Sequence, residues 1–316
     1  MKVLIAPLNW GLGHATRCIP LIRKYIDEGH EVLLGGDGQS LTRLMQEFPS
    51  LPYVSLSPLH LHYAKGTSQV RALLRALPQF ISMYYGDRRI LQQLIKQEHI
   101  DMVISDNRFG LFNHQVTCIY LTHQLYIHLP RTMRFFERLA FQVHRRIWQH
   151  YNQVWVPDYE DETKCLSGAL SHSDYPLPSA VHFIGPLSRL QPTEQIDKRY
   201  DVVALLSGIE PQRSLLEEQI CREWYGKQQK VLIVQGRVSE PFVEWHRGNL
   251  TIVPHLADTQ LTAVLQGTQT IICRSGYSTI MDLATLNLLQ KAKFIPTPGQ
   301  SEQEYLAAFL AKRQKQ

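Results

Sequence analysis

The stretch Cys273-Arg-Ser-Gly-Tyr-Ser-Thr-Ile-Met-Asp282 decides the fold of the second half of this 316-residue chain. An apolar run over residues 269–273 predicts a buried strand that breaks at Ser275-Gly276, and a helix is expected to begin near Ser278. Ser275, Ser278 and Thr279 are residue types that cap helices, and Gly276 lets a ligand approach the backbone closely. Because a helix start presents unpaired N–H groups and a positive dipole end, this junction predicts a phosphate site. Taken alone, the pattern also fits an ordinary strand-to-helix connection.

The residues after this junction add to the prediction. Asp282 lies one helical turn beyond Thr279, where it would reach a ribose attached to the phosphate. After a short helix, residues 292–295 predict another strand. This strand ends in Pro296-Thr-Pro-Gly299 and a carboxamide-rich stretch that includes Gln303.

Together these residues resemble the donor-binding half of family 28 glycosyltransferases of the GT-B fold, which include enzymes that add N-acetylglucosamine to a lipid-linked peptidoglycan precursor. The family pattern corresponds here to Ser275-Gly276, Ser278-Thr279, Asp282 and Gln303-Glu304-Tyr305. The family usually has Glu in place of Asp282, so the side chain that would contact the ribose is shorter here. It usually has Gln-Gln in place of Gln303-Glu304, which leaves the donor sugar open. The resemblance implies a nucleotide-sugar donor, most simply UDP-linked, as co-substrate.

A second signal lies at the N-terminus. Residues 2–6 predict a buried strand, which fits the first strand of a domain better than a signal peptide, and a helix is expected from about Ala15 to Glu28. The loop between them ends in Gly13-His14 and is neither a dinucleotide fingerprint nor a P-loop. A helix dipole opposes the charged form of an imidazole at its start, so His14 would stay neutral and accept a proton. The alternative is a histidine that caps its own helix.

The pattern Gly-x-Gly-His followed by Thr-Arg, residues 11–17, is similar to the N-terminal loop of GT-B glycosyltransferases. In many of them this histidine lies in the cleft between the domains, near the acceptor hydroxyl. The resemblance implies that His14 is the catalytic base and that Gly13 borders the acceptor.

Two further predicted strands end in polar residues. Residues 100–107 end in Asp106-Asn107, and residues 117–124 end in Thr122-His123-Gln124. Ligands of open α/β sheets bind at the carboxyl ends of strands, so Asp106, Asn107 and His123 are candidate acceptor-binding residues. Whether His14 or His123 is the base stays open from the sequence. We favour His14 because it stands at a helix start.

The polar segment 188–200 predicts a domain boundary, with an acceptor domain over residues 1–187 and a donor domain over residues 188–316. A new strand at 201–206 is followed by Ser207-Gly208 and then Arg213, which we expect to help hold a diphosphate. In the resembling family, main-chain groups at the position of Pro254-His255 recognise the uracil of the donor.

The amino-acid composition bears on the compartment of the protein, on metal binding and on its binding partners. The chain has 5 scattered cysteines and no Cys-x-x-Cys pair, which fits a reducing compartment, a cytoplasmic location and no metal site. The net charge is +5, and residues 65–146 carry twelve Lys/Arg against five Asp/Glu. No aromatic stacking motif is interleaved with these basic residues, so nucleic acid is not an expected partner.

A basic helix is predicted over residues 131–150. Its apolar side chains, among them Phe136, Leu139 and Val143, fall on one side at helical spacing, and a row of arginines falls on the other. The arginines of this row are Arg131, Arg134, Arg138 and Arg145. Either this helix packs with a solvated charged face, or it makes a peripheral contact with the inner face of a membrane.

The sequence therefore predicts an α/β protein of two Rossmann-like domains facing across a cleft, as in GT-B. The expected function is inverting transfer of a sugar from a nucleotide-sugar, with His14 as base and without a metal. A nucleotide-sugar 2-epimerase or hydrolase on the same fold, and a binding protein without catalysis, are the alternatives.

Overall fold

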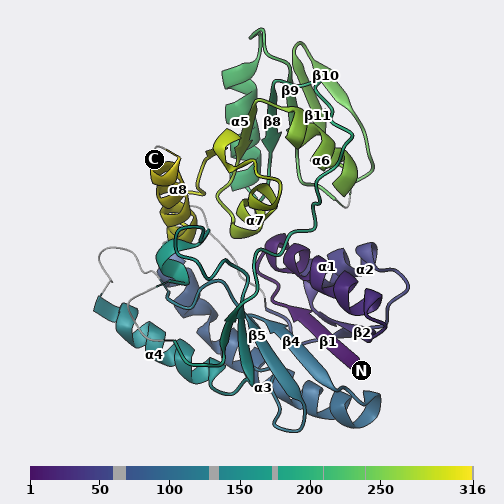
Figure 1. Cartoon of the computed structure of the whole chain (residues 1–316), viewed down its shortest axis with the longest axis vertical. Coiled ribbons are helices and arrows are strands. Elements are labelled where there is room, and N and C mark those ends of the chain that lie inside the picture. Colours follow the sequence, from purple (N-terminus) through teal and green to yellow (C-terminus); the bar gives the residue numbers. More distant parts are fainter. Residues whose placement is uncertain (60–68, 128–134, 173–176, 209, 239, 315–316) are drawn as a thin grey trace. The chain divides into compact units, whose positions relative to one another are not determined.

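The structure is a computed structural model that describes residues 1–59, 69–127, 135–172, 177–208, 210–238 and 240–314, and in residues 69–76 it describes the backbone only. The chain divides into two compact units, Met1–Leu187 and Ser188–Gln316, and the division falls where the polar segment begins. Each unit is a sheet flanked by helices (Figure 1).

The first unit is built on a seven-stranded sheet of order β3-β2-β1-β4-β5-β6-β7, in which every neighbouring pair is parallel. Its strands are β1 (Lys2–Pro7), β2 (Glu31–Gly36), β3 (Tyr53–Ser55), β4 (Met102–Asp106), β5 (Thr117–Leu121), β6 (Gln153–Val156) and β7 (Val181–Phe183). Its helices are α1 (Leu12–Asp27), α2 (Gly38–Glu47), α3 (Gln69–Glu98), α4 (Glu137–Trp148) and the short 3-10 turn η2 (Gly168–Leu170).

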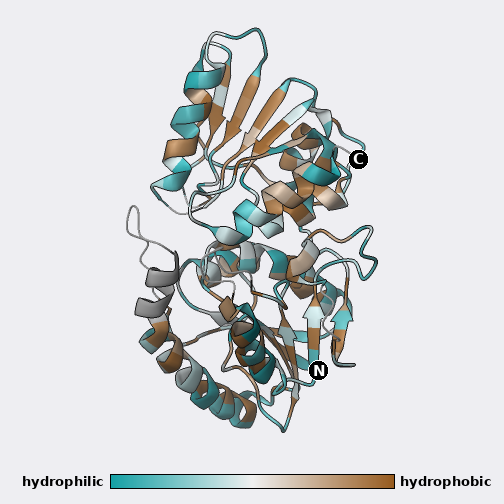
Figure 2. Cartoon of the chain, turned by 90° about the vertical axis from the view of Figure 1, so that its left-hand side faces the viewer, coloured by the Kyte–Doolittle hydropathy of each residue, from teal (hydrophilic) through white to brown (hydrophobic). Residues whose placement is uncertain are grey.

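Side chains of β1 alternate between two hydrophobic cores, one on each face of this sheet. Leu4 and Ala6 belong to one core, and Val3 and Ile5 belong to the other. A strand that is buried on both faces reads as a continuous apolar run, as residues 3–6 do. Figure 2 shows this apolar character in the strands of both units.

The second unit has a six-stranded sheet of order β10-β11-β9-β8-β12-β13, in which only the edge strand β10 is antiparallel. Its strands are β8 (Val202–Leu205), β9 (Val231–Val234), β10 (Trp245–Arg247), β11 (Leu250–Val253), β12 (Thr270–Cys273) and β13 (Ala292–Phe294). Its helices are α5 (Gln212–Trp224), α6 (Asp258–Gly267), α7 (Tyr277–Thr285), α8 (Ser301–Arg313) and the 3-10 turn η3 (Leu289–Lys291).

Each sheet reverses its strand order beside its own first strand, and this is where open α/β sheets bind ligands. In the first unit β1 lies between β2 and β4, and Pro7 pairs with Asp106 at the carboxyl ends. In the second unit β8 lies between β9 and β12, and Leu205 pairs with Cys273. The predicted α/β class with two Rossmann-like sheets is therefore confirmed.

The structure corrects the predicted faces of α4. The side chains that pack inward are Phe141, His144 and Trp148. Leu139 and Val143, predicted to pack, are 56% and 50% exposed. The sequence places apolar side chains on both sides of this helix, and the aromatic side is the one that fills the space beneath β5. Arg138 and Arg145 are also exposed, whereas Arg131 and Arg134 lie outside the described residues.

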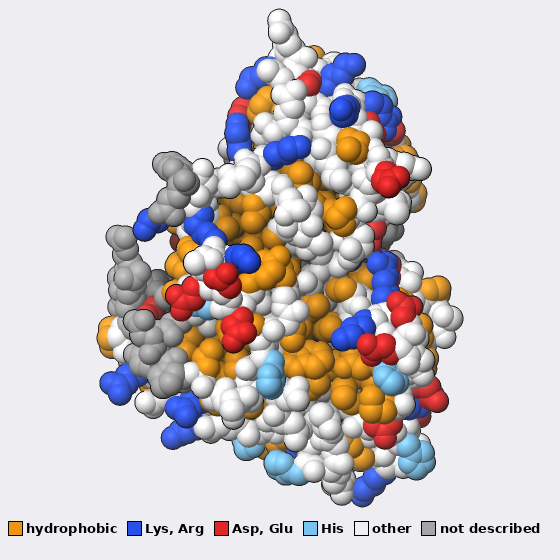
Figure 3. Space-filling view, in the orientation of Figure 1, with side chains coloured by type: hydrophobic (Ala, Val, Ile, Leu, Met, Phe, Trp, Pro, Cys, Tyr) orange, Lys and Arg blue, Asp and Glu red, His pale blue; other side chains and the backbone are white. Residues whose placement is uncertain are grey.

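The predicted basic surface is smaller than the sequence suggests, because Arg108 is fully buried. On the face shown in Figure 3, Lys and Arg side chains lie in several small groups. Among the described residues, no helix combines the length and the apolarity that crossing a membrane requires.

Candidate functional site

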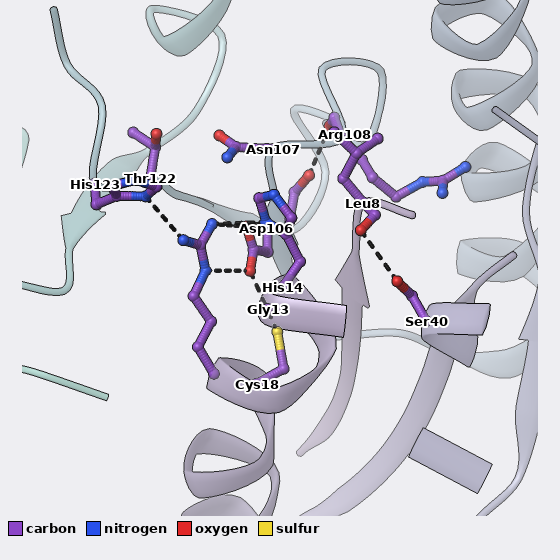
Figure 4. Close-up of polar contacts among 12 residues, drawn as sticks. Leu8, Gly13, His14, Cys18, Ser40, Asp106, Asn107, Arg108, Thr122 and His123 are labelled. Atoms are coloured by element: carbon purple, nitrogen blue, oxygen red, sulfur yellow. Dashed lines mark hydrogen bonds and ion pairs between the residues drawn. The ribbon is translucent and has the colours of Figure 1, made fainter. Parts of the chain in front are cut away.

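In the first unit, His14 and Asp106 meet at the carboxyl ends of β1 and β4 (Figure 4). The Nδ1 atom of His14 lies 2.8 Å from Oδ1 of Asp106. His14 stands in the first turn of α1, which begins at Leu12, three residues earlier than the sequence predicts. Its side chain is 15% exposed, whereas Asp106 is fully buried. Two residues 92 positions apart in the chain thus meet because β1, which precedes α1, pairs with β4.

Two groups face Nδ1 of His14: Oδ1 of Asp106 at 2.8 Å and the donor Nη2 of Arg17, also at 2.8 Å. Because Nη2 directs its protons to Oδ1 of Asp106, we let the Asp106 contact decide the tautomer. An ionised carboxylate only accepts hydrogen bonds, so an unprotonated Nδ1 would set a lone pair against an Asp106 oxygen. We therefore assign the proton of the neutral ring to Nδ1, which donates to Asp106. This leaves the lone pair on Nε2, an atom for which no described residue provides a hydrogen-bond partner. A ring held in this way is ready to accept a proton at Nε2.

Arg17 completes the cluster from the next turn of α1. Its Nε donates to Oδ2 of Asp106 at 2.6 Å, and its Nη2 donates to Oδ1 in a very short contact. Burial by itself would raise the pKa of Asp106, but the charges and hydrogen bonds of Arg17 and His14 outweigh it and hold that pKa well below its usual range. Asp106 is therefore ionised at neutral pH. It orients His14 and balances the Arg17 charge.

His123 joins the same cluster from the end of β5. Arg17 Nη1 lies 2.9 Å from His123 Nδ1, and because a guanidinium only donates, His123 Nδ1 accepts. The His123 side chain is buried. Of the two histidines that the sequence leaves open as base, His14 is the more exposed, and the geometry favours it.

The other predicted acceptor residues of this unit lie around the cluster. The Asn107 carboxamide oxygen accepts from the Tyr120 hydroxyl at 2.9 Å, and Asn107 is half-buried in the left-handed backbone region, with φ 58°. The Gly13 carbonyl accepts from the Thr16 hydroxyl at 3.0 Å. Asp106, in contrast, is buried beneath His14, and this argues for an orienting role instead of direct acceptor contact.

Arg108, which the sequence places beside Asn107, belongs to the interior of the unit. It donates to Asp87 at 2.9 Å and to Asp37 at 2.6 Å, and it is fully buried. Sequence reasoning assigned no role to Arg17, although Arg17 stands at i+3 from His14 and so shares its helix face. That spacing is the signal that would have found it.

In the second unit, the β12–α7 junction differs from the prediction in its capping. Gly276 is the N-cap of α7, and no side chain of the described residues caps this helix start. The Ser275 hydroxyl instead donates to the Gln303 carbonyl at 2.7 Å, and Ser275 is fully buried. Ser278 and Thr279 stand in the first turn and are half-buried. Ser275 thus fixes the junction to α8 and does not cap α7.

Two glycines leave open space at the carboxyl ends of the central strands. A Cβ added to Gly276 would meet no atom within 4 Å, and its φ of −70° is one that any residue adopts. A Cβ on Gly208 would likewise meet nothing, although its φ of +102° favours glycine. Ser207, beside it, is half-buried. The backbone after β8 and β12 is therefore accessible to a ligand.

Arg213 was expected to pair with a diphosphate, but carboxylates already hold it. It forms a very short ion pair with Glu210 and lies 3.6 Å from Glu217. Its Nη1 also donates to the Gln235 carbonyl at 3.2 Å. Because its charge is balanced within the unit, we assign Arg213 to the support of the loop after β8.

Asp282 is buried on α7 and accepts a hydrogen bond from the Ser188 hydroxyl at 2.6 Å. Burial raises the pKa of Asp282, and Arg189 and Ser188 oppose this only in part. Asp282, which was predicted to contact the ribose, therefore already binds Ser188, the first residue of this unit. A ribose would have to share or replace the Ser188 contact.

Gln303 and His255 also make contacts within the unit. The Gln303 carboxamide accepts from the Thr297 N–H at 2.9 Å and donates to Gln300 at 2.6 Å. It stands in α8, a helix that sequence reasoning described only as a polar stretch. His255 Nε2 donates to the Glu240 carbonyl at 3.0 Å, and its ring packs edge-on against Phe242. No group of three or more His, Cys, Asp or Glu residues in the described part of the chain could hold a metal ion.

Comparison with known proteins assigns the fold. No model of a protein family matches the sequence. The solved structure of Phytolacca americana UGT2, complexed with UDP-2fluoro-glucose and pterostilbene, matches 98% of this chain and 83% of that protein, with a TM-score of 0.62 and 16% identity. The spinosyn rhamnosyltransferase SpnG, complexed with thymidine diphosphate, matches 100% of this chain and 92% of its own, with a TM-score of 0.56 and 13% identity. The fold is that of GT-B glycosyltransferases, as the sequence predicts.

Sequence comparison points the same way. A Methanosarcina acetivorans protein named as an uncharacterized glycosyltransferase is 22% identical to this chain over 325 aligned residues, which cover 98% of this chain and 83% of that protein. The similarity thus extends through both units. The narrower likeness to family 28 stays a prediction.

Proposed function

We propose that this protein is a glycosyltransferase that moves a sugar from a nucleoside-diphosphate donor to an acceptor hydroxyl with inversion. The single observation that carries the proposal is the oriented imidazole of His14. Its Nδ1 is held 2.8 Å from a buried, ionised Asp106, so its Nε2 presents a lone pair. The relatives named as glycosyltransferases and the GT-B fold support the same reading.

His14 would act as general base. As the acceptor oxygen attacks the anomeric carbon, Nε2 removes its proton, and the Asp106 carboxylate stabilises the imidazolium that forms. The bond from the anomeric carbon to the diphosphate oxygen breaks on the opposite side. One displacement of this kind inverts the anomeric configuration, and no covalent sugar–enzyme intermediate is formed.

The donor would bind at the carboxyl ends of β8 and β12. The helix start at Gly276 has no side-chain cap and open space above it, and the backbone at Gly208 is equally accessible. Amide groups and the dipole of α7 would stabilise the negative charge of the leaving diphosphate. UDP-2fluoro-glucose and thymidine diphosphate are bound in the solved relatives, so we propose a uridine or thymidine diphosphate donor.

A two-stage experiment tests this function. The full chain is first screened by thermal shift against nucleoside diphosphates and their sugars, and the stabilising donor is then incubated with candidate hydroxyl acceptors. His14→Ala should abolish transfer while leaving donor affinity within about twofold, because His14 belongs to the first unit and the groups that we assign to the donor belong to the second. His182→Ala, a change at an exposed histidine of the same unit, is the matched control.

The same assay separates the alternatives. Loss of the donor without any acceptor would favour a hydrolase or a 2-epimerase, and a 2-epimerase would change the sugar without releasing it. Donor binding with no turnover over a broad acceptor panel would favour a binding protein. Loss of donor binding in His14→Ala would contradict the role of His14 as base.

We also propose a peripheral membrane contact through α4. Leu139 and Val143 expose apolar surface together with the charged Arg138 and Arg145, and Phe135 just before the helix is 75% exposed. Apolar side chains beside arginines suit the boundary of an anionic bilayer, where the arginine stems lie along the surface. In sedimentation with anionic vesicles, Leu139→Ser/Val143→Ser should reduce the bound fraction, and Arg138→Glu/Arg145→Glu should abolish it. Unchanged partitioning of both variants would refute the contact.

A further inference from the structure

Arg274 is a buried cation that no carboxylate among the described residues neutralises. It directly precedes Ser275 at the β12–α7 junction and is 4% exposed. Its Nη1 donates to the carbonyls of Pro296 at 2.9 Å and Ile295 at 3.3 Å, and its Nη2 donates to that of Gln212 at 2.7 Å. Its Nε is buried, and no described residue provides it with a hydrogen-bond partner. In the part of the chain that the structure describes, no carboxylate forms an ion pair with it.

The other buried arginines behave differently. Among the described residues, three further arginines are less than a tenth exposed, and each forms an ion pair. Arg17 pairs with Asp106, Arg108 pairs with aspartates, and Arg213 pairs with glutamates. Arg274 therefore departs from the rule that this chain otherwise follows, that a buried guanidinium has an anion beside it.

Such a charge is costly unless an anion compensates it. A guanidinium keeps its proton in proteins, so Arg274 cannot become neutral as a buried lysine can. Burial lowers the pKa of Arg274, which reflects the same cost. Three carbonyl dipoles offset part of it, but only an anion balances a full charge. The Arg274 side chain thus carries a positive charge that a bound anion would neutralise.

The location of Arg274 indicates where the anion would bind. Its three carbonyl partners lie in the segments that follow β8 and β13, the two neighbours of β12 in the sheet. One side chain therefore connects the segments that follow three adjacent strands, with Gln212 as the first residue of α5. Gly208 and Gly276 leave their backbone open at two of these strand ends.

We propose that Arg274 is a positioning residue of the donor site: it ties together the loops after β8, β12 and β13 and supplies the fixed positive charge that a bound diphosphate neutralises. This inference rests on the proposed function, because it assumes that the diphosphate binds at these strand ends. Arg274 acts through the loops and through its field, and we assign it no direct contact with the ligand.

A matched control exists in the same unit. Lys291 also binds two main-chain carbonyls, those of Gln266 at 3.1 Å and Thr268 at 2.9 Å. These carbonyls precede β12, so Lys291 works at the amino end of the strand at whose carboxyl end Arg274 lies. Lys291→Met thus removes a cation of the same kind without touching the strand ends where ligands bind.

The experiment measures binding to the full chain. UDP, thymidine diphosphate, inorganic pyrophosphate and uridine are titrated by calorimetry into wild type, Arg274→Met, Arg274→Gln, Arg274→Lys and Lys291→Met. We expect Arg274→Met and Arg274→Gln to weaken the preferred nucleoside diphosphate about tenfold or more and uridine less than about twofold, because only the diphosphate senses the lost charge. Arg274→Lys, which keeps the charge but loses the planar fork, should lie between them and wild type. Lys291→Met should bind as wild type does.

Several outcomes would overturn the inference. One is a folded Arg274→Gln that binds the diphosphate within about threefold of wild type; another is an equal loss for uridine and diphosphate, which indicates a structural role alone. If Arg274→Met does not fold, Arg274→Gln and Arg274→Lys decide, because both retain donors for the carbonyls. A wild type that binds none of the phosphorylated ligands would overturn the proposed function together with this inference, whereas normal binding by the variants overturns this inference only.

Discussion

The substitution Asp106→Asn tests the charge of the buried carboxylate, because it removes that charge and keeps the shape of the side chain. Asparagine is nearly isosteric, so packing is kept while the charge between His14 and Arg17 is removed. Arg17 is 2% exposed and would be left as a buried cation without its partner. Breaking a buried pair in this way costs about 3–5 kcal/mol, so we expect the free energy of unfolding of the first unit to fall by about that amount at pH 7.

The loss has a defined pH dependence. The pKa of Asp106 in the folded unit is well below its usual range, and an unfolded aspartate titrates near about 3.9. A carboxylate with a depressed folded pKa contributes stability above its unfolded pKa, and that stability is lost as the pH falls toward the folded pKa. The difference between wild type and Asp106→Asn should therefore be complete above about pH 5 and shrink below about pH 4.

The same variant should change the tautomer of His14. In Asp106→Asn the carboxamide oxygen would take the place of Oδ2 and accept from Arg17 Nε, so the carboxamide NH2 group would take the place of Oδ1, face His14 Nδ1 and require that atom to accept. The ring proton then moves to Nε2, and the proposed base loses its lone pair there. We expect the activity to fall about 10²–10⁴-fold, the scale associated with a mis-oriented general base.

Three measurements examine these expectations. Urea unfolding gives the free energy, hydrogen exchange of the β1 and β4 peptides assigns the loss to the first unit, and ¹⁵N NMR of the imidazole at about pH 8.5 reports the neutral tautomer. Asp101→Asn is the matched control, since this exposed residue beside the amino end of β4 should cost under about 0.5 kcal/mol. A loss below about 1 kcal/mol at pH 7 in Asp106→Asn, or an unchanged His14 tautomer, would refute the reasoning.

The second unit allows three more predictions. Asp282→Asn should stabilise the protein at neutral pH, because burial raises the pKa of Asp282 and the charged carboxylate opposes folding above the unfolded pKa. The gain in the free energy of unfolding should vanish as the pH falls below about 4. A variant that is less stable than wild type at pH 7 would contradict this. Gly276→Val should change the free energy of unfolding by less than about 1 kcal/mol, because a Cβ at this position meets open space. It should nevertheless weaken nucleoside diphosphate binding about tenfold or more in calorimetry. Unaltered binding would place the ligand elsewhere. Sugar transfer should survive dialysis against EDTA, because we assign neutralisation of the diphosphate charge to the α7 helix start and Arg274. Activity that returns only with added Mg²⁺ or Mn²⁺ would exclude that assignment.

Those parts of this protein that depend on local pattern could be predicted from the amino-acid sequence. The runs at residues 2–6, 201–206 and 269–273 predicted buried strands, because a strand covered on both faces is rich in apolar side chains. The structure has strands at Lys2–Pro7, Val202–Leu205 and Thr270–Cys273. Glycine and small polar residues after these strands marked the ligand-facing ends, and His14 was found at the first of them.

Which side chains meet depends on the tertiary structure alone. Arg17 reaches Asp106 across 89 positions and His123 across 106, and strand order, which no local propensity records, brings them together. The same holds for Ser275, which bonds to α8 in place of capping α7, and for α4, whose two apolar sides compete for one interior. Arg274 is the clearest case: the sequence shows an arginine beside Ser-Gly, and only the packing of three segments shows that it is buried and that no described carboxylate pairs with it. Local pattern fixes where a strand ends, whereas the charge environment at that end depends on segments that arrive from far along the chain.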